Sequence, residues 1–267
     1  MVFIHGVNNQ TTNYSSVLYQ KMLTICREKL AQRKFDPASI EKILNKSVQH
    51  EVLWADITTD LTNRFLQLEY GEHSHFFWDI LKKPVDPLAI QIMQYIKDKG
   101  DKQSGRMSIL RRMHTDIKNI FSWKDLGEDP ARSEGNSIIM VAHSLGAVIA
   151  YDYVMGFRKE YSLLNIKKDI TVKSFITMGS PIPLFVAAMG HPDSDLTLPH
   201  YVKKWVNILS IRDGIARRVQ PFFRNISISE HEVNTGFFPL QAHAGYWNNT
   251  ATATHIANEV LIALGIK

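Results

Sequence analysis

The sequence predicts an α/β fold in which helices cover both faces of a mostly parallel sheet. Continuous apolar runs such as residues 137–141 are typical of strands buried on both faces. These runs alternate with segments of helical periodicity, which indicates β-α-β crossovers. With 267 residues, 45% hydrophobic and 21% charged, the chain is large enough to bury a full core. We therefore expect one domain over residues 1–267.

The expected elements follow one another in chain order. The predicted strands are short apolar or β-branched runs, at residues 2–4, 51–55, 137–141, 170–178 and 202–211. The helices are predicted from apolar residues at helical spacing or from a capping signal. They lie at residues 15–34, from Asp36-Pro37 onward, and at residues 86–100, 109–121, 147–155 and 252–264.

Residues 56–106 contain no convincing buried strand, and we interpret them as a helical insertion resembling a cap or lid. The apolar helix 86–100 leads into a basic stretch, which fits contact with an anionic membrane surface. It fits equally a helix packed on the core with a solvated rim. Both interpretations stay open at this stage.

Composition excludes several classes of protein. The formal charge is +5, but the basic residues are spread out and no DNA- or RNA-reading motif occurs, so nucleic acid is not an expected partner. Cys26 is the only cysteine, which rules out an intramolecular disulfide and suits the cytoplasm. The sequence shows no signal peptide, and the apolar stretch 138–157 carries polar groups unsuited to a membrane span. We expect a cytoplasmic protein, at most peripheral to a membrane.

Ser144 stands in a short motif between the most hydrophobic strand and a helix. The segment Val141-Ala142-His143-Ser144-Leu145-Gly146 resembles the nucleophile elbow, small-x-Ser-x-small, of the α/β-hydrolase family. A strained turn brings the residues two before and two after the serine close together, so only small side chains fit. Ala142 departs from the usual glycine but satisfies this steric demand.

This resemblance implies an oxyanion hole and a substrate pocket. The N–H of Leu145 would be one oxyanion donor, and the N–H of Val7, just after His5-Gly6, would be the second. His5, Gly6 and, in the segment after the next strand, Ser180 would line the pocket. If residues 2–4 match the family's third strand, the two strands before it are missing, as in a minimal version of the fold or a fragment.

The family's chain order places an acid after the serine. Asp213 follows the apolar run 205–211, where a strand should end. Its segment Asp213-Gly214-Ile215-Ala216 resembles the turn that carries the acid in lipase-like members. Asp193 and Asp195 are the alternatives, but they lie in a loop far from any strand end.

A histidine base should come after the acid. His243 stands in a segment that resembles the His-x-x-Tyr-Trp element of lipase-like hydrolases, and we expect it in a loop before the terminal helix. Tyr246 and Trp247 would pack that loop down. His231 and His255 are the alternatives.

Together these residues predict a serine esterase that acts on a lipid or acyl ester through a Ser144-His243-Asp213 triad, with no metal and no cofactor. The same machinery would serve a thioesterase, acyltransferase or amidase. A non-catalytic interaction module or a membrane-surface binding protein on the same fold is the alternative outside enzymes.

Overall fold

A computed structural model describes residues 1–6, 10–58, 63, 91–92, 95, 105–122, 137–156, 159–166, 170–188 and 196–266. Most of the predicted helix 86–100 and most of the predicted insertion 56–106 lie outside these ranges, and the described residues 91, 92 and 95 are helical. The expectation of a cap or lid therefore stays a prediction.

The described residues form one six-stranded sheet, and every strand pair in it is parallel. The strand order is β2-β1-β3-β4-β5-β6. The strands are β1 (Val2–Ile4), β2 (His50–Val52), β3 (Ser137–His143), β4 (Thr171–Met178), β5 (Trp205–Leu209) and β6 (Ile228–Glu232). The predicted α/β class is confirmed.

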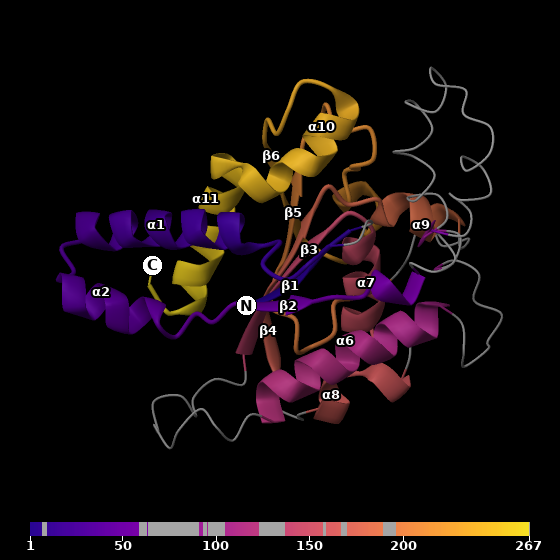
Figure 1. The fold of residues 1–267 in the computed structure, drawn as a ribbon, viewed down its shortest axis with the longest axis horizontal. Coiled ribbons are helices and arrows are strands. Elements are labelled where there is room, and N and C mark those ends of the chain that lie inside the picture. The colour runs from indigo at the N-terminus through magenta and orange to yellow at the C-terminus, as the bar shows by residue number, and fades with distance from the viewer. Residues whose placement is uncertain are drawn as a thin grey trace.

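Helices cover both faces of this sheet (Figure 1). One layer holds α1 (Ser16–Gln32), α2 (Pro37–Leu44) and α11 (Thr250–Ala263). The other face is covered by α6 (Gly105–Ser122), α7 (Leu145–Val154), α8 (Leu163–Ile166) and α9 (Ile182–Ala188). A short helix, α10 (Pro239–Ala244), comes just before α11 in the chain.

Strand β3 shows why the sheet needs two helical layers. Its side chains alternate, so Ile139 and Val141 pack into the core shared with α1 and α11. Ile138 and Met140 pack into the core on the side of α7. Apolar residues therefore occupy successive positions, and this explains the continuous run that predicted the strand.

Three strands differ from their predicted form. The structure ends β2 at Val52, because Trp54 leaves the sheet and stacks on the ring of His5. Strand β5 is shorter than the apolar run 202–211 that predicted it. Strand β6 was not predicted at all, since its polar sequence Ile-Ser-Glu-His-Glu suits an edge strand and lacks an apolar run.

The strand order creates a switch point between β1 and β3. From β1 the chain moves outward to β2, whereas from β3 it moves in the opposite direction to β4. In open parallel sheets, ligand sites lie at the carboxyl ends of the strands at such a point. The residues after β1 and β3 are His5-Gly6 and Ser144.

No helix of the described residues is both long enough and apolar enough to cross a membrane.

The N-cap of α11 gives a test of the fold. The side chain of Asn249 accepts a hydrogen bond from Thr252 N–H at 2.8 Å and donates one to Asn234 O at 2.7 Å. We expect Asn249→Ala to lower the free energy of unfolding by about 1 kcal/mol, the usual cost of a lost cap. Thr250→Ala, a change at an exposed position of the same helix, should alter it by less than about 0.5 kcal/mol. Urea unfolding measures both, and equal effects would contradict the assignment of the cap.

Candidate active site

Ser144 makes the whole turn between β3 and α7. Its φ is +55° and its ψ is −130°, a conformation that residues other than glycine rarely adopt. The N–H of Ser144 donates to Met178 O on the neighbouring strand at 3.1 Å, which holds the turn against the sheet. The predicted strained turn between strand and helix is therefore present.

Two glycines let the end of β1 approach this turn. A Cβ at Gly146 would lie only 2.2 Å from the carbonyl oxygen of His5, so no larger residue fits without a backbone shift. A Cβ at Gly6 would lie 2.6 Å from the Cβ of Ser144. The backbone after β1 thus lies directly beside the serine side chain.

Ser144, His243 and Asp213 come together in space. The Oγ of Ser144 lies 2.8 Å from Nε2 of His243. Nδ1 of His243 lies 3.0 Å and 2.9 Å from the two carboxylate oxygens of Asp213. With its proton on Nδ1, the imidazole donates to Asp213 and accepts from the serine hydroxyl.

His243 lies in a different element from the one that we expected. The sequence predicts a loop, but the structure places His243 in α10, which begins at Pro239. Proline is favoured in the first turn of a helix, and its fixed φ suits that position. His243 is therefore carried by a short helix instead of an open loop.

The carboxylate of Asp213 is buried and closely bonded. Besides His243, it accepts hydrogen bonds from the N–H groups of Ile215 at 2.8 Å and Ala216 at 3.1 Å, and from the hydroxyl of Tyr246 at 2.9 Å. Burial, the largest single influence, raises the pKa of Asp213, but the bonds from His243 and from the two amides outweigh it and lower the pKa below its ordinary value. The group is held in its ionised form.

Tyr246 connects the acid to the sheet. Its buried hydroxyl donates to Asp213 and accepts from the N–H of Ser210 at 2.8 Å, just after β5. Burial, the largest influence, and the nearby charge of Asp213 raise the pKa of the phenol, which keeps it a donor. The sequence predicted only loop packing for Tyr246.

His143 is a second residue whose part the sequence did not reveal. Its Nε2 lies 2.8 Å from the carbonyl oxygen of His243, and the two rings are 4.8 Å apart. Burial lowers the pKa of His143 to about 3, so the ring is neutral and can donate from Nε2. Its position beside Ser144 is a local signal, but nothing in the sequence indicates its partner.

His5 makes its contacts with neighbouring protein groups, and its expected place in the lining of the substrate pocket stays a prediction. Its ring stacks on Trp54, with centroids 5.1 Å apart, and its Nδ1 lies 2.6 Å from Gly6 O. The indole N–H of Trp54 donates to His5 O at 3.0 Å. Burial lowers the pKa of His5 to about 4.

The other predicted site residues have different outcomes. Val7, the second predicted oxyanion donor, lies outside the described residues. Leu145 is the first residue of α7, where backbone N–H groups have no acceptor within the helix. Ser180 is buried, and its hydroxyl accepts a hydrogen bond from Ile182 N–H at the start of α9.

The alternatives to the acid and the base lie elsewhere. Asp193 and Asp195 fall outside the described residues. The rings of His231 and His255 stack on each other at 4.1 Å, on β6 and α11. The described residues contain no group of three or more His, Cys, Asp or Glu side chains placed to hold a metal ion.

Two surface hollows are lined by described residues. One, of about 160 Å³, lies between β2 and α6, and the other, of about 240 Å³, lies beside the ends of β5 and β6. Ser144, Asp213, His243, Gly6 and Ser180 line neither of them. The acyl pocket that the sequence predicts therefore stays a prediction.

Comparison of the sequence with protein-family models and with curated proteins gives no match. The chemical interpretation therefore rests on geometry. A serine hydroxyl bonded to an imidazole, which is bonded in turn to a buried carboxylate, can lose its proton to the imidazole as it attacks an electrophile.

The two buried histidines predict how stability depends on pH. Their folded pKa values, about 3 for His143 and about 4 for His5, lie below the ordinary value of 6.5. The unfolded chain binds these protons as pH falls through about 6.5, whereas the folded chain does not. We expect the free energy of unfolding to fall from about pH 6.5 downward, by up to about 1.4 kcal/mol per pH unit for each ring.

Urea unfolding over this pH range measures the slope. His143→Gln should make it shallower, because the variant has one fewer ring to protonate on unfolding. The exposed His200→Gln should leave it unchanged. A slope that His143→Gln does not alter would contradict the burial of a neutral His143.

Proposed function

We propose that this protein is a serine hydrolase of the α/β-hydrolase type that cleaves a carboxylic ester of a lipid or acyl chain. The observation that carries the proposal is the continuous hydrogen-bonded chain from Ser144 Oγ through His243 to Asp213, at 2.8 Å and 2.9 Å. It starts at a serine with positive φ on a turn between strand and helix. Each of these features belongs to the family's nucleophile elbow and triad.

The first half of the reaction forms an acyl-enzyme. The oxygen of Ser144 attacks the ester carbonyl carbon while Nε2 of His243 takes the hydroxyl proton. The ionised Asp213 stabilises the resulting imidazolium through Nδ1–H. The N–H of Leu145, at the N-terminus of α7, donates to the oxyanion. The C–O bond to the alcohol then breaks, and His243 returns the proton to the leaving alkoxide.

The second half uses the same groups on water. His243 takes a proton from a water molecule, whose oxygen attacks the acyl carbon of Ser144. The tetrahedral intermediate collapses, the carboxylic acid leaves and the serine recovers its proton. Both halves need a neutral His243 ring whose Nδ1 is bonded to Asp213 and whose Nε2 faces Ser144, which is the arrangement in the structure.

The single, buried Cys26 suits a location in the cytoplasm, and we include that location in the proposal. A thioester or an acyl acceptor other than water would use the same steps. A substrate screen over p-nitrophenyl esters of varied length, phospholipids and acyl thioesters distinguishes these cases.

Labelling with a fluorophosphonate probe tests the nucleophile. We expect covalent labelling of the native protein, complete loss in Ser144→Ala, and a labelling rate at least about a thousandfold lower in His243→Gln, because the serine loses its base. Ser162→Ala, a serine near α8, should label normally. Folded native protein that takes up no probe would refute the proposal.

Because Tyr246 positions the carboxylate of Asp213, its loss should slow the reaction. Tyr246→Phe removes the hydrogen bond to Asp213 and the acceptor for Ser210 N–H. A hydrogen bond to a charged group contributes about 1.5–3 kcal/mol, so we expect kcat to fall about tenfold or more with KM little changed. Tyr201→Phe, which removes a buried hydroxyl bonded to Val154 O, is the matched control. Steady-state kinetics on a soluble ester measure both, and equal kcat values would contradict this role for Tyr246.

A further inference from the structure

Large apolar side chains gather on the surface beside the candidate site. Ile211 is 77% exposed, Phe237 68%, Phe238 66% and Leu240 51%. We call these four residues the apolar rim. Exposed single apolar residues are ordinary on a protein surface, but a group of four, with two neighbouring phenylalanines, indicates a surface that meets something apolar.

The apolar rim is formed by two neighbouring segments of the chain. The guanidinium of Arg212 lies 5.0 Å from the centre of the Phe237 ring. A Cβ at Gly214 would lie 3.4 Å from the side chain of Pro239. The loop after β5 and the segment before α10 therefore lie side by side, near the top of the view in Figure 1.

The same two segments carry the acid and the base. Ile211 and Arg212 come immediately before Asp213 in the chain. Leu240 lies on α10, one turn before His243. Whatever the apolar rim contacts is therefore held next to the elements that carry Asp213 and His243.

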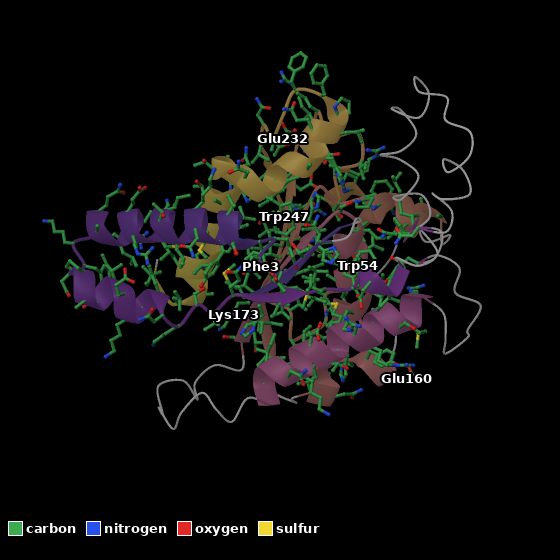
Figure 2. All side chains as sticks on the ribbon, in the orientation of Figure 1. Phe3, Trp54, Glu160, Lys173, Glu232 and Trp247 are labelled. Carbon is green, nitrogen blue, oxygen red and sulfur yellow. The ribbon has the colours of Figure 1, made fainter. Side chains whose placement is uncertain are left out.

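Two arginines lie in the segment that follows Ile211 of the apolar rim. Arg212 is exposed, and Arg217 donates to the carbonyl oxygens of Gly214 and Ala216. Among the described residues, neither guanidinium forms an ion pair with a carboxylate. Glu232, the acidic side chain labelled near this end in Figure 2, is bonded to Arg218. Arg212, which lies over the Phe237 ring, and Arg217, which donates to backbone carbonyls, both keep a positive charge that suits an anionic partner.

A second copy of the chain fits this surface poorly. A stable dimer buries about 800 Å² on each partner, whereas four side chains that each offer roughly 100–150 Å² supply only about half to three quarters of that. A two-fold axis would also bring Arg212 near its own copy, and like charges repel.

We propose that the apolar rim docks on the surface of an anionic phospholipid membrane. The phenylalanine rings enter the boundary between headgroups and acyl chains, while Arg212 and Arg217 stay with the phosphates. Docking itself is independent of the proposed function. The further consequence, that a lipid ester passes from the membrane to Ser144, rests on the proposed function.

Vesicle flotation of the Ser144→Ala protein, which prevents turnover, tests the docking. We expect binding to phosphatidylcholine vesicles with about one third phosphatidylglycerol to be about tenfold tighter than to pure phosphatidylcholine, and to weaken as salt rises. The double change Phe237→Ser and Phe238→Ser should weaken it at least about tenfold. The matched control is Val17→Ser with Ile262→Ser, two exposed residues on α1 and α11, and it should bind normally.

Three outcomes would overturn the docking: no binding of the parent protein to the anionic vesicles, equal binding by the Phe237/Phe238 variant, or equal loss in the control. Should the double variant not fold, Arg212→Gln replaces it, with weaker binding to anionic vesicles as the expected result. Light scattering that shows a dimer which the double variant dissociates would assign the surface to self-association and refute the proposal.

Hydrolysis of a soluble short-chain ester separates the two proposals. With Ser144 intact, the Phe237/Phe238 variant should hydrolyse such an ester at the native rate but lose activity on esters held in anionic vesicles. Missing fluorophosphonate labelling refutes the hydrolase alone, whereas missing vesicle binding refutes the docking alone.

Discussion

The structure around Ser144 depends on one close contact between two pieces of backbone, the end of β1 and the start of α7. The contact exists because Gly146 has no side chain, since a Cβ there would lie 2.2 Å from His5 O. It holds the first turn of α7 against β1, so the chain has to reverse within a single residue, and Ser144 takes a φ of +55°. The close contact at Gly146 therefore explains both the turn at Ser144 and the position of the N-terminus of α7. Gly6 extends the same contact to the serine side chain.

A network of buried polar groups then fixes the base relative to this turn. Asp213 and Ser144 bond to the two nitrogens of the His243 ring, and His143 bonds to its backbone carbonyl. Tyr246 ties Asp213 to the backbone at Ser210. Trp247 packs against Phe3 and His143, and Figure 2 labels Phe3 and Trp247 close together. Because these polar groups satisfy one another, burial costs less and the arrangement is specific.

Short sequence patterns predicted those elements that form because of residues close together in the chain. Strand β3 is buried on both faces, so its apolar run is unbroken, and Asp36-Pro37 supplies both cap and first turn of α2. Strand β6 was not predicted, because it lies at the edge of the sheet, pairs only with β5 and carries polar residues. For the site, the chain order of serine, acid and base, together with the local motifs at Ser144, Asp213 and His243, selected three residues that meet in space. The bonds from His143 to residue 243 and from Tyr246 to Asp213 join positions 100 and 33 residues apart, a separation that no periodicity reports.

The separation of Ser144 from His243 also matters while the chain is being made. The serine precedes the histidine by 99 residues, so at roughly 5–20 residues per second a ribosome takes about 5–20 seconds between them. Strands β1 and β3 can pair during that interval, but Trp247 reaches Phe3 only after the last elements emerge. A nascent chain, or one cut short before α10, therefore carries Ser144 without its base. Under the proposed function, such incomplete chains would not yet hydrolyse an ester.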